Sequence, residues 1–377
     1  MDPHFPIAPA LLLTVLSLVS LPVAHAAGCP GEALWSPFVH HFVSPDGRVV
    51  DRHTPAHHTT SEGQAYALFF ALVADDREHF ERLLRWTEAN LAGGDLTARL
   101  PAWQWGRDGE GAWRVLDDNA ASDADLWLAY TLGEAGRIWG DGRLAALGEL
   151  LAERILAEER MEIPGLGPVL LPGPRGFRTE SGGARLNPSY LPLQLLRRLH
   201  TLYPGHGWGA LLESSRRLLQ AFPSGLQPDW LLARPDGALR SDPHKGPHGS
   251  YDAIRVYLWA GMLDGEEPLR REVLDHLAPM ARLTAERGVP PLRVDVLTGK
   301  AEGSAPPGFS AALLPFLASQ GEPEVLRQQC LRLRANPLSR RPDHYYEQVL
   351  ALFGLGWLQG RYRFGADGRL ILPREGS

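Results

Sequence analysis

Connections of two lengths alternate strictly along this chain of 377 residues. Apolar residues recur at helical spacing in about twelve segments, and the links between these segments are either very short or long and rich in Gly, Pro and Trp. Because short links make antiparallel helix pairs, six pairs that close on each other would place every long link at one end. The pattern therefore predicts an all-α chain, an (α/α)6 barrel with one elaborated face. An open α-solenoid is the alternative, but no fixed repeat period is present.

We predict a single domain over residues 28–377, with little strand structure except a short hairpin within residues 362–372. Proline at the first helical position supports the start at residue 188, and an acidic first turn supports the start at residue 122. The predicted helical segments span residues 31–42, 62–74, 76–91, 122–137, 141–160, 188–202, 207–221, 250–263, 266–286, 306–318, 323–334 and 343–358.

The N-terminus has the pattern of an export signal. Residues 10–23 are nearly all apolar, and the following Ala-His-Ala at residues 24–26 is a small-x-small cleavage site. The apolar run is too short for a membrane span. We therefore predict that residues 1–26 are removed, that the mature chain has no membrane span, and that it is periplasmic or secreted. Cys29 and Cys330 are the only cysteines, and the sequence leaves open whether they pair or whether Cys29 is lipidated.

Charge and motif content exclude several classes of partner. The net charge of -6 provides no basic footprint, so nucleic acid is not an expected partner. The chain has neither the His-Glu-x-x-His spacing of a zinc site nor a Gly-rich phosphate loop, so we expect no metal and no cofactor.

The 11 Trp exceed what core packing requires, and flat apolar rings suit sugar faces. Trp103 and Trp105 are the best stacking candidates. In an extended loop their rings would point the same way, so both would line a groove or both belong to the core.

Carboxylates stand at the starts of alternate helices, on the predicted long-loop face. Glu62 begins the second segment, Asp123 the fourth and Asp252 the eighth. A structural alternative exists for Glu62, because Thr59 and Glu62 have the spacing of a capping box. Together, however, the acids fit paired-carboxylate chemistry, in which one acid donates a proton and another takes a proton from water.

The two chemical roles make different demands on these acids. A helix N-terminus stabilises an ionised carboxylate, whereas a general acid must carry a proton. A proton donor at Glu62 therefore needs desolvation or an ionised neighbour, for which Asp123 is the candidate. Asp252, as the base, should stay ionised, and Arg255 one turn further on could hold it.

Three stretches resemble glycoside hydrolase family 8. Ala-Ser-Asp-Ala-Asp-Leu-Trp-Leu-Ala-Tyr-Thr-Leu-Gly-Glu-Ala at residues 121–135 is similar to the family signature, with departures only at packing positions. Thr-Thr-Ser-Glu-Gly-Gln-Ala-Tyr at residues 59–66 resembles the proton-donor segment. Ser-Tyr-Asp-Ala-Ile-Arg-Val-Tyr-Leu-Trp at residues 250–259 resembles the general-base segment of the subgroup whose base is an Asp. Further similar stretches occur at residues 100–106, 164–167, 300–303 and 308–316.

This resemblance implies an (α/α)6 barrel that cleaves β-1,4-glucan chains internally, with inversion at the anomeric carbon. It implies that Glu62 is the proton donor and Asp252 the general base. Asp123 would hold the sugar at the cleavage point, although signature-based descriptions call this residue the nucleophile. Tyr190 and Arg255 match positions that support the base and its water. The chain looks most like the periplasmic cellulases that accompany bacterial cellulose synthase, so the implied partners are a cellulose chain and the synthase export machinery.

Two alternatives to a cellulase remain open from the sequence. A catalytically silent helical toroid that guides glucan strands would need the tryptophans but not the three acids. The same mechanism could also act on another β-1,4 chain, such as chitosan, xylan or mixed-linkage glucan.

Overall fold

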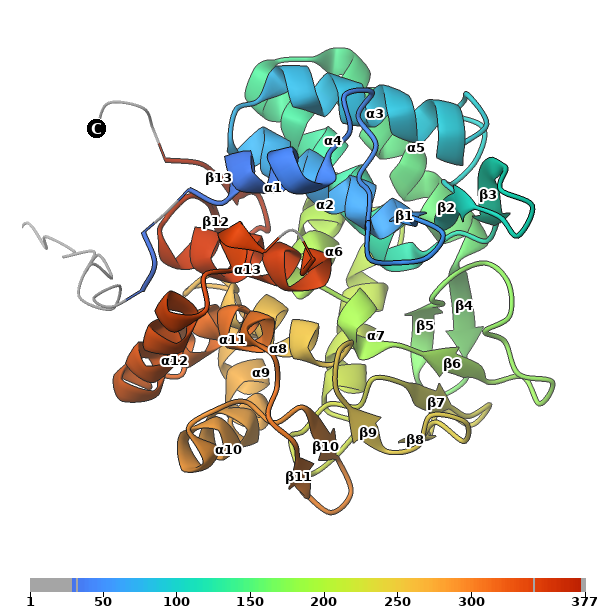
Figure 1. Cartoon of the computed structure of the whole chain (residues 1–377). Coiled ribbons are helices and arrows are strands. Elements are labelled where there is room, and N and C mark those ends of the chain that lie inside the picture. Colours follow the sequence, from blue (N-terminus) through green and yellow to red (C-terminus); the bar gives the residue numbers. More distant parts are fainter. Residues whose placement is uncertain (1–28, 32, 342, 374–377) are drawn as a thin grey trace, which may run out of the picture.

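The computed structural model describes residues 29–31, 33–341 and 343–373 (Figure 1). Helices form about half of this part of the chain, and their positions follow the predicted segments closely. Their bounds are α1 Trp35–Phe42, α2 Ser61–Val73, α3 Arg77–Leu91, α4 Ser122–Trp139, α5 Gly142–Glu158, α6 Leu193–Leu202, α7 Trp208–Leu219, α8 Ile254–Gly261, α9 Arg270–Leu277, α10 Pro279–Arg287, α11 Pro307–Ser319, α12 Pro323–Ala335 and α13 Tyr345–Leu358, with short 3-10 helices η2 Pro188–Tyr190 and η3 Leu338–Arg340.

The long connections contain short antiparallel strands, which the sequence did not predict, although the predicted hairpin near the C-terminus is confirmed as β12 and β13. Strands of this length bury too few residues to leave an alternating pattern. The strands are β1 Thr59–Thr60, β2 Gln104–Arg107, β3 Trp113–Asp117, β4 Arg160–Ile163, β5 Gly167–Leu170, β6 Ala184–Leu186, β7 Leu231–Ala233, β8 Leu239–Ser241, β9 His248–Gly249, β10 Arg293–Asp295, β11 Ala301–Glu302, β12 Arg363–Phe364 and β13 Leu370–Ile371. They pair in the orders β1-β2-β3, β4-β5, β6-β7-β8, β11-β10-β9 and β12-β13.

The predicted alternation of inner and outer helices is confirmed. Helices α2, α4, α6, α8, α11 and α13 form the inner layer, and most of them pack against an outer partner that follows in the chain, as α4 does against α5 and α11 against α12. The outer α1 packs against the inner α13, so the two ends of the chain complete the sixth pair (Figure 1). In α2, every residue except Glu62 and Val73 is buried, as expected for a helix surrounded by others.

Aromatic side chains close the inner layer at its centre. Phe353 of α13 lies 4.6 Å from Phe70 of α2, 5.0 Å from Trp127 of α4 and 5.0 Å from Trp259 of α8, measured between ring centroids. Tyr66 of α2 makes a further edge contact with the same ring at 5.0 Å. Four inner helices therefore meet around one phenylalanine, which is the packing that closes a barrel.

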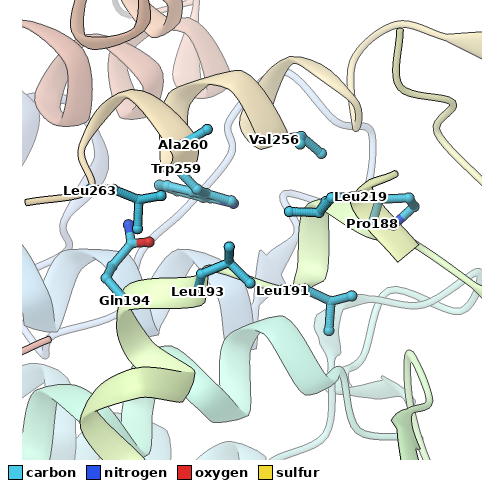
Figure 2. Close-up of a pocket in the computed structure, with 9 residues that line it drawn as sticks. All are labelled: Pro188, Leu191, Leu193, Gln194, Leu219, Val256, Trp259, Ala260 and Leu263. Carbon is cyan, nitrogen blue, oxygen red and sulfur yellow. The ribbon is translucent and has the colours of Figure 1, made fainter. Parts of the chain in front are cut away.

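The packing of α6 against α8 is less tight. Trp259 and Val256 of α8 face Leu193 of α6 and Leu219 of α7 across an apolar gap of about 10 Å³ (Figure 2). A gap of this size holds at most one water-sized probe. It is a packing defect in the wall and not a ligand site.

Three predicted helices are shorter than expected. The segment predicted at 188–202 starts as the 3-10 helix η2, and its α-helix α6 begins only at Leu193. The segment predicted at 266–286 is two helices, α9 and α10, because Pro279 has no backbone N–H to continue the first one. The segment predicted from residue 250 begins its helix only at Ile254. Asp252 therefore precedes α8 in a turn instead of standing in the first turn of a helix.

The N-terminal region is attached to the outer layer by a covalent bond. Cys29 forms a disulfide with Cys330 of α12. This pairing settles the question that the sequence left open, since a lipidated Cys29 would have no sulfur atom free to pair. The predicted export signal at residues 1–26 lies outside the described residues. None of the helices in the described part of the chain has the length and apolar content of a membrane span.

Candidate active site

The start of α2 leaves the Glu62 side chain free for chemistry. Thr60, and not Thr59, is the N-cap residue: its Oγ1 accepts a hydrogen bond from the Gly63 N–H at 3.0 Å. Thr59 instead donates to the Val49 carbonyl oxygen at 2.6 Å. The capping-box alternative for Glu62 is therefore wrong. The Glu62 carboxylate contacts other partners than the N–H groups at the start of α2.

Glu62 is held by two groups from the barrel interior. The Tyr66 hydroxyl, one turn further along α2, donates to Glu62 Oε1 at 2.9 Å. Arg255 Nη1 from α8 donates to the same oxygen. The Glu62 side chain remains 28% exposed, so a substrate on the open face can reach it.

Arg255 brings the three predicted acids together. Its Nη1 contacts Glu62, while its Nη2 lies 3.2 Å from Asp252 Oδ1 and 3.8 Å from Asp123 Oδ2. The same Nη2 donates to the Ser189 hydroxyl at 3.0 Å. Glu62 and Asp252 thus contact different nitrogens of one guanidinium.

Asp123 is the most enclosed of the three acids. Its side chain is 3% exposed, and its Oδ1 accepts a hydrogen bond from the Ala124 N–H at 2.9 Å. Burial raises the pKa of Asp123 well above its ordinary value, and the charge of Glu62 adds to this effect. Among the described residues, the buried Asp123 Oδ2 has no hydrogen-bond partner, and it lies 3.8 Å from Arg255 Nη2.

Asp252 opens onto a cavity of about 290 Å³. Burial raises the pKa of Asp252; Arg255 opposes that shift, whereas the neighbouring charge of Asp229 adds to it. Trp230 lines the same cavity, which has room for water and for part of a sugar ring.

Aromatic rings border the Asp252 side of the site. Tyr190 of η2 lies 6.4 Å from the Trp230 ring, and the Arg255 guanidinium lies 5.7 Å from the Tyr190 ring centroid. Burial raises the pKa of the Tyr190 hydroxyl well above its ordinary value, so it stays protonated and can donate a hydrogen bond. Trp230 also stacks on Phe177, with ring centroids 5.8 Å apart. Sequence reasoning did not single out Trp230, although its place in a long Pro-rich loop was a usable signal.

The two predicted stacking tryptophans have different surroundings. Trp103 lines a cavity of about 120 Å³ together with Thr60 and Tyr345, close to the start of α2. Trp105 instead stacks on Trp113, with ring centroids 5.2 Å apart and planes at 13°. The expectation that both rings would share one environment is wrong. The strand pair shifts register between residues 104 and 105, and such a bulge re-aims the side chains of a strand.

The Trp105 stack forms part of the rim of the molecule. The Arg48 guanidinium lies 4.3 Å from the Trp105 ring and 4.6 Å from the Trp113 ring. Trp86 meets Trp105 edge-on at 5.3 Å. Trp113 is 48% exposed, so the outward ring of this stack is Trp113 and not Trp105.

Comparisons with known proteins agree with this geometry. Residues 6–360 match the family described as Glycosyl hydrolases family 8. The chain is 48% identical to an endoglucanase of Xanthomonas axonopodis pv. citri, covering 95% of this chain and 94% of the relative. It is 44% identical to an endoglucanase of Escherichia coli K12, covering 96% and 95%. The crystal structure of an endo-1,4-D-glucanase from Vibrio fischeri ES114 superposes with a TM-score of 0.84 at 44% identity, covering 90% of this chain and 98% of that one.

Proposed function

Because this chain belongs to glycosyl hydrolases family 8, we propose that Glu62, Asp252 and Asp123 are the residues with which it hydrolyses β-1,4-glucan. The chain is an inverting endo-β-1,4-glucanase that cleaves internal bonds of chains such as cellulose. One observation carries the assignment of residues: the guanidinium of Arg255 contacts all three carboxylates at the mouth of the barrel.

In the proposed reaction, Glu62 and Asp252 act on opposite faces of one sugar ring. Asp252 takes a proton from a water molecule, whose oxygen attacks the anomeric carbon. The bond from that carbon to the bridging oxygen breaks, and Glu62 gives its proton to the departing oxygen. One water is consumed, and the configuration inverts because attack and departure occur on opposite faces. The cavity beside Asp252 supports this arrangement, since an inverting enzyme needs room for the water.

Neighbouring groups support the transition state and the substrate. Asp123, whose Oδ2 accepts no hydrogen bond from the described residues, binds a hydroxyl of the distorted sugar at the cleavage point. Tyr190 and Arg255 orient the base and its water. Trp103 and Trp105 are the aromatic contacts predicted for the glucan. The cavity beside Trp103 favours direct stacking there, whereas Trp105 supports the exposed Trp113 from behind.

A reducing-sugar assay on carboxymethylcellulose, combined with viscometry, tests the activity. An internal cut lowers viscosity early, before many reducing ends are released. Proton NMR of the first product from cellopentaose distinguishes inversion from retention. Retention of configuration, or full activity of Glu62→Gln, would reject the assigned mechanism.

The finer substrate choice and the biological setting belong to the same proposal. We infer that cellulose is preferred over chitosan, xylan and mixed-linkage glucan; the relatives named endoglucanases support this choice, and a substrate panel tests it. A silent glucan-guiding toroid is the second candidate, and it predicts glucan binding without any release of reducing ends.

We also propose that the chain acts in the periplasm or outside the cell, beside the cellulose synthase export machinery. The export-signal pattern in residues 1–26 and the disulfide between Cys29 and Cys330 support an oxidising compartment. Cell fractionation, together with crosslinking in a strain that makes cellulose, tests the compartment and the partner.

A further inference from the structure

Asp229 receives hydrogen bonds from the whole turn that carries Asp252. Its Oδ1 accepts from the backbone N–H groups of Ser250 at 2.7 Å, Asp252 at 3.1 Å and Ala253 at 2.8 Å. Its Oδ2 accepts from the Ser250 hydroxyl at 2.8 Å. Three backbone donors, at residues 250, 252 and 253, thus converge on one carboxylate, which fixes the backbone on both sides of Asp252.

The opposite side of this turn is also anchored. The Tyr346 hydroxyl of α13 donates to the Tyr251 carbonyl oxygen at 2.6 Å. On the preceding side, β9 pairs with β10, and Gly249 has no room for a Cβ because the Gln227 carbonyl lies against it. The turn is therefore held at its N–H groups by Asp229 and at the Tyr251 carbonyl by Tyr346. Its carbonyls also accept hydrogen bonds from the first N–H groups of α8, as Ser250 does from Ile254 at 3.1 Å.

We propose that Asp229 is a positioning residue for the reaction: it fixes the turn that presents the general base and places a negative charge beside Asp252. This inference rests on the proposed function, because it takes Asp252 to be the base. Asp229 itself acts through Asp252 and through the N–H groups of the turn.

The charge of Asp229 matters because Asp252 has few other negative neighbours. The charged or titratable groups that face Asp252 come from several elements: Arg255 on α8, Glu62 on α2, Asp123 on α4, Tyr190 of η2, Tyr346 on α13, Asp229, and Lys245, His248 and Arg293 around the shared cavity. Asp229 and Glu62 raise the pKa of Asp252, after the larger effect of burial, while Arg255 lowers it. Removing the charge of Asp229 should therefore let Asp252 stay ionised at lower pH.

Two variants separate the geometric effect from the electrostatic one. Asp229→Ala removes every acceptor of the turn, and we expect kcat to fall about 100-fold with little change in KM, as for a misplaced catalytic group. Asp229→Asn keeps an oxygen for the three N–H groups but removes the charge. We expect it to retain much of the kcat while the acidic limb of its kcat/KM profile moves to lower pH. A merely structural role would not move that limb.

Matched controls come from Asp95, which caps an exposed turn in the same way. Asp95 accepts from the Thr97 N–H at 2.8 Å and from the Thr97 hydroxyl at 2.6 Å. Asp95→Ala and Asp95→Asn should leave kcat and the pH profile unchanged. Unfolding of Asp229→Ala, seen by circular dichroism, would leave the decision to the pH profile of Asp229→Asn.

The outcomes distinguish this inference from the proposed function. An unshifted acidic limb in Asp229→Asn, or nearly full kcat in folded Asp229→Ala, would overturn the role of Asp229. If Asp252→Asn is inactive in the same series, only this inference fails. If Asp252→Asn is fully active, the proposed base itself is wrong.

Discussion

The two halves of the proposed catalytic pair are positioned by different means. Glu62 is the second residue of α2, a helix that is buried along almost its whole length. Asp252 lies in an irregular turn before α8, where one carboxylate and one tyrosine hydroxyl hold the backbone. The donor is thus fixed by the barrel wall, whereas the base is fixed by side chains from two other segments.

This difference has a consequence for tolerance to mutation. A helix distributes its stability over many backbone bonds and buried contacts, so no single neighbour decides where Glu62 stands. A turn depends on a few specific hydrogen bonds, and losing one of them moves the residue it carries. We therefore expect chemically similar substitutions near Glu62 and near Asp252 to differ in their measured effects.

The largest effect is expected from removing the proton donor itself. Glu62→Gln should lower kcat by about 10³- to 10⁴-fold, because the amide cannot protonate the leaving oxygen. Binding of cellopentaose, measured by calorimetry, should be nearly retained. Glu78→Gln is the matched control, since Glu78 stands in the first turn of the outer helix α3 and should leave kcat unchanged.

Removing the guanidinium that links the two sides should have the next largest effect. We expect Arg255→Met to lower kcat about 100-fold, because both carboxylates lose their shared partner. Arg255 lowers the pKa of Asp252, so its loss should raise that pKa and move the acidic limb of the kcat/KM profile to higher pH. This direction is opposite to that expected for Asp229→Asn.

Arg197→Met provides the control for Arg255→Met. Arg197 pairs with Glu267 at 2.6 Å, away from the three acids. Its loss should lower the melting temperature without moving the pH profile. A profile of Arg255→Met that coincides with wild type would show that the guanidinium does not set the protonation of the base.

Two substitutions that each remove one tyrosine hydroxyl compare the hydrogen bond that holds Glu62 with the hydrogen bond that holds the Asp252 turn. Tyr66→Phe removes a hydrogen bond to the Glu62 carboxylate and should lower kcat about tenfold, since bonds to charged groups contribute about 1.5–3 kcal/mol. Tyr346→Phe removes a neutral bond to the turn, which contributes about 1 kcal/mol, and should lower kcat about threefold to fivefold. Equal effects would contradict the proposed difference between the two sides.

The smallest effects are expected from the aromatic residues that border the proposed site. Trp103→Ala on the Glu62 side and Trp230→Ala on the Asp252 side should each raise KM about threefold, with kcat nearly unchanged, because each removes apolar contact of about 1 kcal/mol. Trp86→Phe is the control, because Trp86 is buried behind Trp105. If kcat fell without a change in KM, the substituted ring would act in the chemical step and not in substrate binding.

Much of the fold could be predicted because its signal is local. Each inner helix carries an apolar run, and five of the six pairs are joined by a short link, so most of the barrel follows from patterns within about 40 residues of sequence. The acids Glu62 and Asp123 could be placed at helix starts for the same reason. The turn around Asp252 could not, because the residues from 250 onward have helical spacing, whereas their conformation also depends on the distant Asp229 and Tyr346.

The sequence by itself thus determined the helical pairing, the inner and outer layers, and the identity of the acids that meet on one face. Only the tertiary structure decided how they meet. The contact between Arg255 and Glu62 spans 193 positions of the chain, and the disulfide between Cys29 and Cys330 spans 301. Periodicity records which face of a helix is buried, but it carries no record of which distant side chain lies opposite. That choice depends on how the closed barrel is packed.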